Sequence, residues 1–246
     1  MNSIFSRSAL VIFLCTAQYA RADFVIDSFN ESGSELIYVF GAIQPSDTDT
    51  KDPIPTSEVA GGVRRLDLTA LHGSALATLS HGDALGTLDW VNQNYTSTKA
   101  LITYGIGAGG ASIGDVTGGN VESQLSLGVV SNDHGFSYVL EIEDENSVVS
   151  TYSDTVAGGV VGDINMNFSD FVGTADLTKV DTIRLQMIAV DSLDLTLTSI
   201  LATAASVVPE PSTLATAVFG IALVSVRRRR SFSERFRHAP EDSMVT

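Results

Sequence analysis

The chain has 246 residues, a single cysteine and a formal net charge of −15 at pH 7. This length accommodates one sizeable domain together with targeting segments. Residues 23–206 hold 25 Asp and Glu against 6 Lys and Arg, a net charge of −19. Such an excess of negative charge repels nucleic acid and anionic lipid, so nucleic acid is excluded as a partner. It is typical of a solvated acidic surface.

Residues 1–22 have the pattern of a cleavable secretory signal peptide. Arg7 supplies the positive n-region, residues 9–17 form an apolar h-region, and Ala20 and Ala22 define a small-x-small cleavage site. The apolar run is too short to span a bilayer. Cys15 lies within it, so we expect export of a mature chain that uses neither disulfides nor thiol chemistry.

Residues 23–201 are predicted to form an all-β domain, an antiparallel, jelly-roll-like β-sandwich. Short apolar stretches recur between Gly, Asn and Asp clusters, and no convincing amphipathic helix interrupts them. In the second half, apolar and polar residues alternate with a period of two. The prolines of residues 44–57 predict a loop, and residues 202–208 are expected to be a linker. The expected strands are at residues 24–29, 37–40, 66–68, 75–79, 87–91, 100–104, 125–129, 136–142, 183–187 and 193–198.

The glycine-rich stretch from Gly105 to Gly110 satisfies the spacing G-x-G-x-x-G, which in dinucleotide-binding proteins precedes a helix. Residues 111–120 are a poor helix candidate, so a glycine loop is the better interpretation. His72, His81 and His134 occupy turn-like contexts without metal-ligand spacing. No recognisable catalytic motif is present, which predicts a protein that is not an enzyme.

Two groups of residues carry the oxygen donors that a Ca²⁺ site needs. Asp163, Asn165 and Asn167 place oxygen donors at alternate positions, as in the start of a Ca²⁺ loop. The glycine and glutamate that complete such a loop are missing, and a strand explains the alternation equally well. The acids of the proline-rich loop, Asp47 and Asp49 with Asp52, are another candidate group. No cofactor is predicted. The sequence leaves open whether a structural Ca²⁺ is bound, and it assigns no ligands to such an ion.

Aromatic residues suggest a place where sugar rings could stack. Trp90, the only tryptophan, has Tyr95 and Tyr104 nearby in sequence, and we treat the three as candidate ligand-binding residues. The alternative is that Trp90, between Leu88 and Val91, belongs to the core.

The C-terminal region combines three features in a fixed order. Pro209, Glu210 and Pro211 are followed by an apolar stretch over residues 212–226 and then by a basic cluster. This cluster consists of Arg227, Arg228, Arg229 and Arg230. Proline is tolerated in the first turn of a helix, so a short transmembrane helix over 212–226 is predicted. The positive-inside rule keeps the four arginines cytoplasmic as the topology anchor and the β domain outside, and residues 231–246 form a cytoplasmic tail.

This segment, residues 209–230, resembles the PEP-CTERM sorting signal of Gram-negative and related bacteria. The resemblance implies recognition by exosortase, cleavage near Pro209–Pro211 and transfer to the cell surface, often alongside exopolysaccharide. The tail over residues 231–246 departs from the pattern, because such signals usually end at the basic cluster. The stretch from Phe168 to Ile183 is similar to a segment of jelly-roll carbohydrate-binding modules. Such a similarity supports the prediction of a fold better than the prediction of a ligand.

Together these features predict an exported, exosortase-sorted surface or extracellular-matrix protein. It is anchored in the membrane before processing, and its non-enzymatic β-sandwich binds extracellular polysaccharide. One alternative is a secreted glycan hydrolase whose carboxylate pair is hidden among the 25 acids. The other is a purely structural or adhesive module without a ligand.

Overall fold

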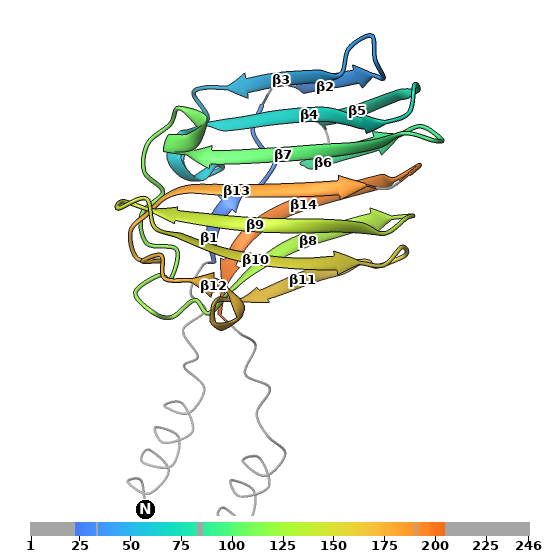
Figure 1. Ribbon diagram of the computed structural model, residues 1–246. Helices are drawn as coiled ribbons and strands as arrows, with labels where there is room; N and C mark the ends of the chain where they lie inside the picture. The colour runs from blue at the N-terminus through green and yellow to red at the C-terminus, as the bar shows by residue number, and fades with distance from the viewer. Residues whose placement is uncertain (1–22, 33, 83–85, 190, 205–246) are drawn as a thin grey trace, which may run out of the picture. The chain divides into compact units, whose positions relative to one another are not determined.

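Alternating inward apolar and outward polar side chains build two antiparallel sheets that pack face to face (Figure 1). The computed structural model describes residues 23–204, apart from residues 33, 83–85 and 190. Two seven-stranded sheets account for most of this region, which confirms the all-β sandwich expected from the sequence.

The first sheet, called sheet A here, has the order β11-β8-β14-β6-β5-β2, and β1 pairs with β14. β2 is therefore an edge strand. The strands of sheet A are β1 (Phe24–Asp27), β2 (Glu35–Phe40), β5 (Leu76–Gly82), β6 (Thr87–Asn92), β8 (Gln124–Asn132), β11 (Gly162–Asn167) and β14 (Asp194–Thr203).

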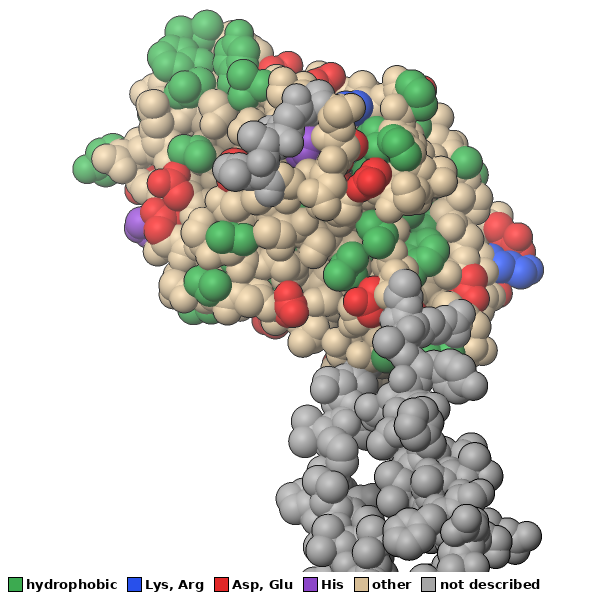
Figure 2. Space-filling model, turned by 180° about the vertical axis from the view of Figure 1, so that it is seen from behind, with side chains coloured by type: hydrophobic (Ala, Val, Ile, Leu, Met, Phe, Trp, Pro, Cys, Tyr) green, Lys and Arg blue, Asp and Glu red, His purple; other side chains and the backbone are tan. Residues whose placement is uncertain are grey.

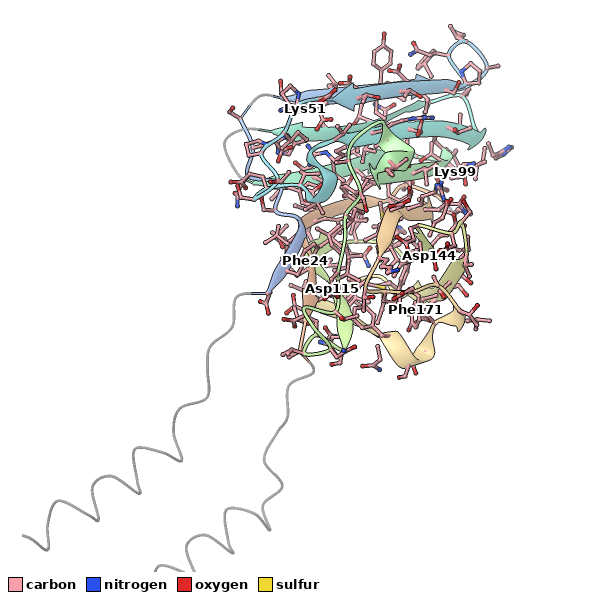
Figure 3. The ribbon with its side chains drawn as sticks, turned by 90° about the vertical axis from the view of Figure 1, so that its left-hand side faces the viewer. Phe24, Lys51, Lys99, Asp115, Asp144 and Phe171 are labelled. Atoms are coloured by element: carbon pink, nitrogen blue, oxygen red, sulfur yellow. The ribbon has the colours of Figure 1, made fainter. Side chains whose placement is uncertain are left out.

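The second sheet, sheet B, has the order β12-β10-β9-β13-β7-β4-β3. Seen from the side, Phe24 lies on the sheet A side of the sandwich, and Lys99 and Asp144 lie on the sheet B side (Figure 3). The strands of sheet B are β3 (Ser46–Lys51), β4 (Arg64–His72), β7 (Ser97–Gly105), β9 (Phe136–Asp144), β10 (Val149–Val156), β12 (Val172–Gly173) and β13 (Val180–Ala189).

The core lies between the sheets and is formed by the inward residue of each alternating pair. On β9, for example, Phe136, Tyr138, Leu140 and Ile142 are buried, while the residues between them are partly exposed. Burying a large apolar side chain contributes roughly 1.5–3 kcal/mol, so this alternation is the main local determinant of the sandwich. Short 3₁₀ turns at Ala60–Gly62, Ile106–Ala108 and Phe168–Asp170 connect strands.

Three sequence expectations about elements need correction. The expected loop at residues 44–57 contains β3, a polar edge strand that pairs with β4 along its whole length. β10 was not expected, because its outward residues are polar and its inward ones are only partly apolar. The expected linker begins too early, since Ala202 is fully buried and pairs with both Phe24 and Leu125.

Candidate functional site

The outer face of sheet A is a hydrogen-bonding surface made of short polar side chains. Strand register places five outward residues in one row across β2, β5, β6, β14 and β8: Leu36, Ser80, Asp89, Thr196 and Ser131. A neighbouring row across the first four of these strands contains Tyr38, Thr78, Val91 and Asp194.

Basic residues are distributed unevenly between the two sheets. The described strands of sheet A contain no Lys or Arg, whereas those of sheet B contain Lys51, Arg64, Arg65, Lys99 and Arg184. Figure 2 shows the sheet A side, where uncharged polar side chains and backbone dominate and blue atoms appear only near the rim. This face therefore suits a neutral, hydroxyl-rich ligand better than an anionic one.

Asp89 is a fixed acceptor near the middle of this face. Thr196 donates its hydroxyl to Asp89 Oδ1 at 2.7 Å, and the Thr87 hydroxyl lies 3.4 Å from Oδ2. The carboxylate is partly buried between β5 and β14. Because its position is set before any ligand arrives, a hydrogen bond to Asp89 costs little ordering.

Apolar side chains gather at the β2 edge of the same face. Leu36, Tyr38 and Phe40 are 61%, 45% and 42% exposed. On the side of β2 that faces away from β5, the backbone of Tyr38 already has hydrogen-bond partners. Its N–H donates to the Asp47 carboxylate at 3.0 Å, and its carbonyl oxygen accepts from the Gln44 side chain at 3.2 Å. These contacts hinder the addition of another strand, so the exposed rings are the accessible feature of this edge.

A second candidate site is a buried ionic cluster between the sheets, centred on Arg64 of β4. Arg64 Nη1 donates to Asp27 of β1 at 2.8 Å, and Nε donates to Glu35 of β2 at 3.0 Å. Nη2 contacts both Glu31 and Glu35. The guanidinium also lies 5.2 Å from the centre of the Phe29 ring. Three carboxylates thus share one guanidinium in the interior.

Burial and mutual charge shift the pKa values of this cluster. Burial raises the pKa of Asp27 to about 6, although the charge of Arg64 opposes the change. Burial alone would lower the pKa of Arg64, but the charges of Asp27 and Glu35 raise it overall. Burial, together with the charge of Asp27, raises the pKa of the Tyr104 phenol well above its ordinary value. Arg64 is therefore permanently charged.

His81 of β5 lies beside this cluster and is 1% exposed. Its Nε2 is 2.8 Å from the Phe29 carbonyl oxygen, so Nε2 carries a hydrogen, and in the neutral ring Nδ1 presents a lone pair. Nδ1 lies 3.4 Å from Glu31 Oε1 and has no hydrogen-bond partner among the described residues. One ligand atom from each of Glu31, Glu35 and His81 lies within 4.8 Å of the other two. These three side chains could hold a metal ion.

The aromatic residues proposed from sequence are not brought together on one surface. Trp90 is 1% exposed, and its Nε1 donates to Thr98 at 3.1 Å. Tyr104 is fully buried next to Arg64, with which it pairs across β4 and β7. Neither ring presents a face to solvent, so of these three residues only Tyr95, at 82% exposed, is placed to stack on a sugar.

Sequence reasoning placed the histidines in turns, and for His81 this is wrong because it lies within β5. His134 does lie in the turn between β8 and β9, and exposed His72 ends β4. The residues weighed as calcium ligands are on strands: Asp47 and Asp49 on β3, with Asp52 just after it, and Asp163, Asn165 and Asn167 on β11.

Two surface hollows lie at opposite ends of β8. One, of about 370 Å³, is lined by His134, Phe136 and Asp191 among others. The other, of about 600 Å³, is lined by four residues between 117 and 123 and by residues 167–169 and 175–178, and Glu122 and Asp176 are among them. Hydrogen bonds from Thr178 lower the pKa of Asp176, which keeps it ionised near neutral pH. A glycosidase acid needs the opposite shift.

Both targeting segments predicted from the sequence lie outside the described residues. At the N-terminus these are the signal peptide and its cleavage site at Ala20 and Ala22. At the C-terminus they are the Pro209–Pro211 triplet with Glu210, the predicted helix at 212–226, the tail at 231–246, and the topology anchor made of Arg227, Arg228, Arg229 and Arg230. Among the residues that the structure does describe, none form a helix long and apolar enough to cross a membrane.

Comparison with protein families identifies one segment of the chain. Residues 207–230 match the PEP-CTERM protein-sorting motif, in agreement with the resemblance seen in the sequence. The matched range includes the Pro-Glu-Pro triplet and extends through Arg228 and Arg229 to Arg230. The motif indicates export and targeting to the membrane or cell surface. No curated protein matches the chain.

Among solved structures, the chain is similar to the family 11 carbohydrate-binding module of cellulase Lic26A-Cel5E from Clostridium thermocellum, at 14% identity and a TM-score of 0.39. This match covers 76% of the chain and 96% of the module. A solution structure of CtCBM11 gives a TM-score of 0.41 at 13% identity, covering 76% of the chain and 98% of that structure. An exo-β-agarase gives a TM-score of 0.39 at 12% identity, covering 74% of the chain and 24% of the agarase.

Proposed function

We propose that this chain is an exported cell-surface or extracellular-matrix protein that exosortase processes at its C-terminal signal. The match of residues 207–230 to the PEP-CTERM motif carries this proposal. Before processing, the predicted helix at 212–226 holds the protein in the membrane, and Arg227–Arg230 stay on the cytoplasmic side. Pro209, Glu210 and Pro211 are the recognition triplet.

The β-sandwich, in this proposal, binds neutral polysaccharide on the outer face of sheet A and catalyses no reaction. The ligand class follows from the rows of hydroxyl groups, the absence of Lys and Arg from the described strands of this sheet, and the fixed acceptor Asp89. Tyr38 supplies an exposed aromatic ring beside the polar rows. Stacking on a ring combined with hydrogen bonds to short polar groups is a common way to hold a sugar.

Sorting is tested by deleting Pro209–Pro211 in the native host and determining the mature C-terminus by mass spectrometry. We expect the deleted form to keep residues 212–246 and to accumulate in the membrane fraction. The matched control removes Pro240, Glu241 and Asp242 from the tail, a deletion of similar size and composition. An unchanged C-terminus and normal surface display after deletion of the triplet would refute the sorting proposal.

Polysaccharide binding is tested by affinity electrophoresis of the detergent-solubilised full-length chain in gels containing neutral or anionic polysaccharides. We expect retardation by a neutral polymer and about a tenfold weaker interaction for Tyr38→Ala, in line with the energy of one aromatic contact. Lys99→Ala, on the outer face of sheet B, is the control and should bind normally. If Tyr95→Ala loses binding and Tyr38→Ala does not, the ligand lies at the β6–β7 turn instead.

A further inference from the structure

We propose that Glu31, Glu35 and His81 form a buried binding site for one divalent transition-metal ion such as Zn²⁺ or Mn²⁺. The three residues come from the loop after β1, from β2 and from β5. The site is separate from the outer face of sheet A and from the sorting signal, so it does not depend on the function proposed for either.

Charge balance is the first reason. Asp27, Glu31 and Glu35 are 0%, 4% and 2% exposed, and the only guanidinium that the described residues place in this cluster is that of Arg64. The three carboxylates and the single guanidinium carry a net charge of −2 in the interior. Buried charge without compensation costs several kcal/mol per ion, so the cluster favours an additional positive species. One divalent cation would neutralise it.

The orientation of His81 is the second and independent reason. Nε2–H donates to the Phe29 carbonyl oxygen at 2.8 Å, which is the outer hydrogen bond that metal-binding histidines usually make. This bond directs Nδ1 toward Glu31 Oε1 and Glu35 Oε2, at 3.4 and 4.0 Å, and Arg64 Nη2 contacts the same two oxygens. Nδ1, Glu31 Oε2 and Glu35 Oε1 are buried and have no hydrogen-bond partner in the described part of the chain. A lone pair facing carboxylate oxygens is unfavourable, and either a metal ion between the ligands or a proton on Nδ1 would relieve it.

The separation of the donor atoms favours a metal ion over a shared proton. A direct N–H···O bond would place Nδ1 about 2.7–3.2 Å from the carboxylate oxygen. Two metal–ligand bonds of about 2.1 Å that meet at a tetrahedral angle separate their donors by about 3.4 Å. The observed distance from Nδ1 to Glu31 Oε1, an oxygen that Arg64 Nη2 also contacts, is 3.4 Å. One imidazole with two carboxylates suits Zn²⁺ or Mn²⁺ better than Ca²⁺, which prefers oxygen ligands throughout.

An ion could reach the site through a surface pocket of about 190 Å³ that touches Glu31. The pocket is lined by residues 30–32 and by residues between 51 and 58, including the acidic Glu58 and the basic Lys51, whose Nζ donates to the Ser32 carbonyl oxygen. Ser28 donates its hydroxyl to Glu58 at 2.5 Å, so this carboxylate is held in place at the pocket.

The test uses the full-length chain in detergent, dialysed against a chelator and then titrated with Zn²⁺, Mn²⁺, Ca²⁺ or Mg²⁺. Calorimetry and elemental analysis should show one Zn²⁺ or Mn²⁺ per chain, together with a rise in the unfolding temperature. His81→Ala should weaken binding at least tenfold and abolish the rise. His134→Ala is the matched control, because this exposed histidine is in the β8–β9 turn, and it should bind like the wild type.

Glu31→Gln provides a second variant that preserves side-chain volume, in case His81→Ala does not fold cooperatively. It should also weaken binding at least tenfold. The proposal is overturned if the wild-type chain retains no stoichiometric metal. It is also overturned if both variants bind as tightly as the wild type, which would place the ion elsewhere on this acidic surface. Stability that depends on pH through His81 but not on any metal would identify a proton as the compensating species.

Discussion

Arg64 of β4 donates from Nη1 to both carboxylate oxygens of Asp27 of β1, at 3.0 and 2.8 Å. The two residues are 37 positions apart and belong to opposite sheets. Both side chains are fully buried. The pair therefore joins the two layers at a point where apolar packing is replaced by charge, and the stability of the sandwich depends on keeping both partners.

Removing Arg64 should be strongly destabilising. Arg64→Ala leaves three carboxylates buried without their guanidinium, and breaking a buried pair typically costs about 3–5 kcal/mol. We expect a loss of this size in the free energy of unfolding, measured by urea denaturation of the metal-free protein. Arg65→Ala is the control. The Arg65 side chain is 43% exposed and pairs with Asp67 at the surface, so it should cost less than about 1 kcal/mol.

The Asp27 carboxyl should make stability fall as pH rises from about 4 to 6. Burial raises its pKa from 3.8 to about 6 in the folded chain, so the folded state binds more protons in this window. The stabilisation from protonated Asp27 is fully present below the pKa of this carboxyl in the unfolded chain, and it is lost as the pH rises through its pKa in the folded chain. The free energy of unfolding should fall by at most about 1.4 kcal/mol per pH unit in this window. Asp27→Asn should remove this component from the profile of unfolding free energy against pH. A profile identical to that of the wild type would contradict the prediction.

Trp90 should behave as a core residue. Trp90→Ala is expected to cost about 3–5 kcal/mol, because a large buried ring is replaced by a cavity. Trp90→Phe preserves more volume but removes the donor to the Thr98 hydroxyl, so it should cost less. Thermal unfolding with both variants distinguishes the two effects. If Trp90→Phe stays folded and loses polysaccharide binding while keeping its unfolding temperature, the ring has a ligand role that its burial does not suggest.

Gly73, between β4 and β5, should not tolerate a side chain. Its φ is +101°, and a Cβ there would lie 2.2 Å from the Tyr95 carbonyl oxygen. Gly73→Ala should therefore cost about 2 kcal/mol or more through both strain and overlap. Gly109→Ala is the matched control, because its φ is also positive, at +95°, but nothing lies within 4 Å of the added atom. Equal losses in the two variants, measured by urea denaturation, would show that overlap plays no part.

Much of the buried cluster could be recognised as inward-facing from the sequence. Arg64 lies two and four positions before the buried Leu66 and Leu68, and His81 lies two positions after the buried Leu79. Residues separated by two positions on a strand face the same side of the sheet. A period of two therefore predicts that the Arg64 and His81 side chains both point into the sandwich. The prediction of a turn at His81 is wrong because β5 continues through Gly82. Glu31 carried no such signal, since it lies in the irregular segment after β1.

The position of the proposed ligand face could not be predicted in the same way. Residues 36–40 are uniformly apolar, so no alternation says which of them face outward. Pairing of β2 with β5 places Ile37 and Val39 in the core and leaves Leu36, Tyr38 and Phe40 outside. Trp90 and Tyr104 differ in the opposite sense. The sequence suggested that they form a surface site, but both rings are buried in the core.

The sequence by itself determined the all-β class, most of the strands and the sorting signal, because alternation and short motifs are local properties of the chain. Only the tertiary structure decided which side chains meet. Asp27, Arg64 and His81 are distant in sequence, and they converge because β1, β4 and β5 stack across the sandwich. Contacts between sheets depend on register and layer order, which no local pattern in the chain encodes.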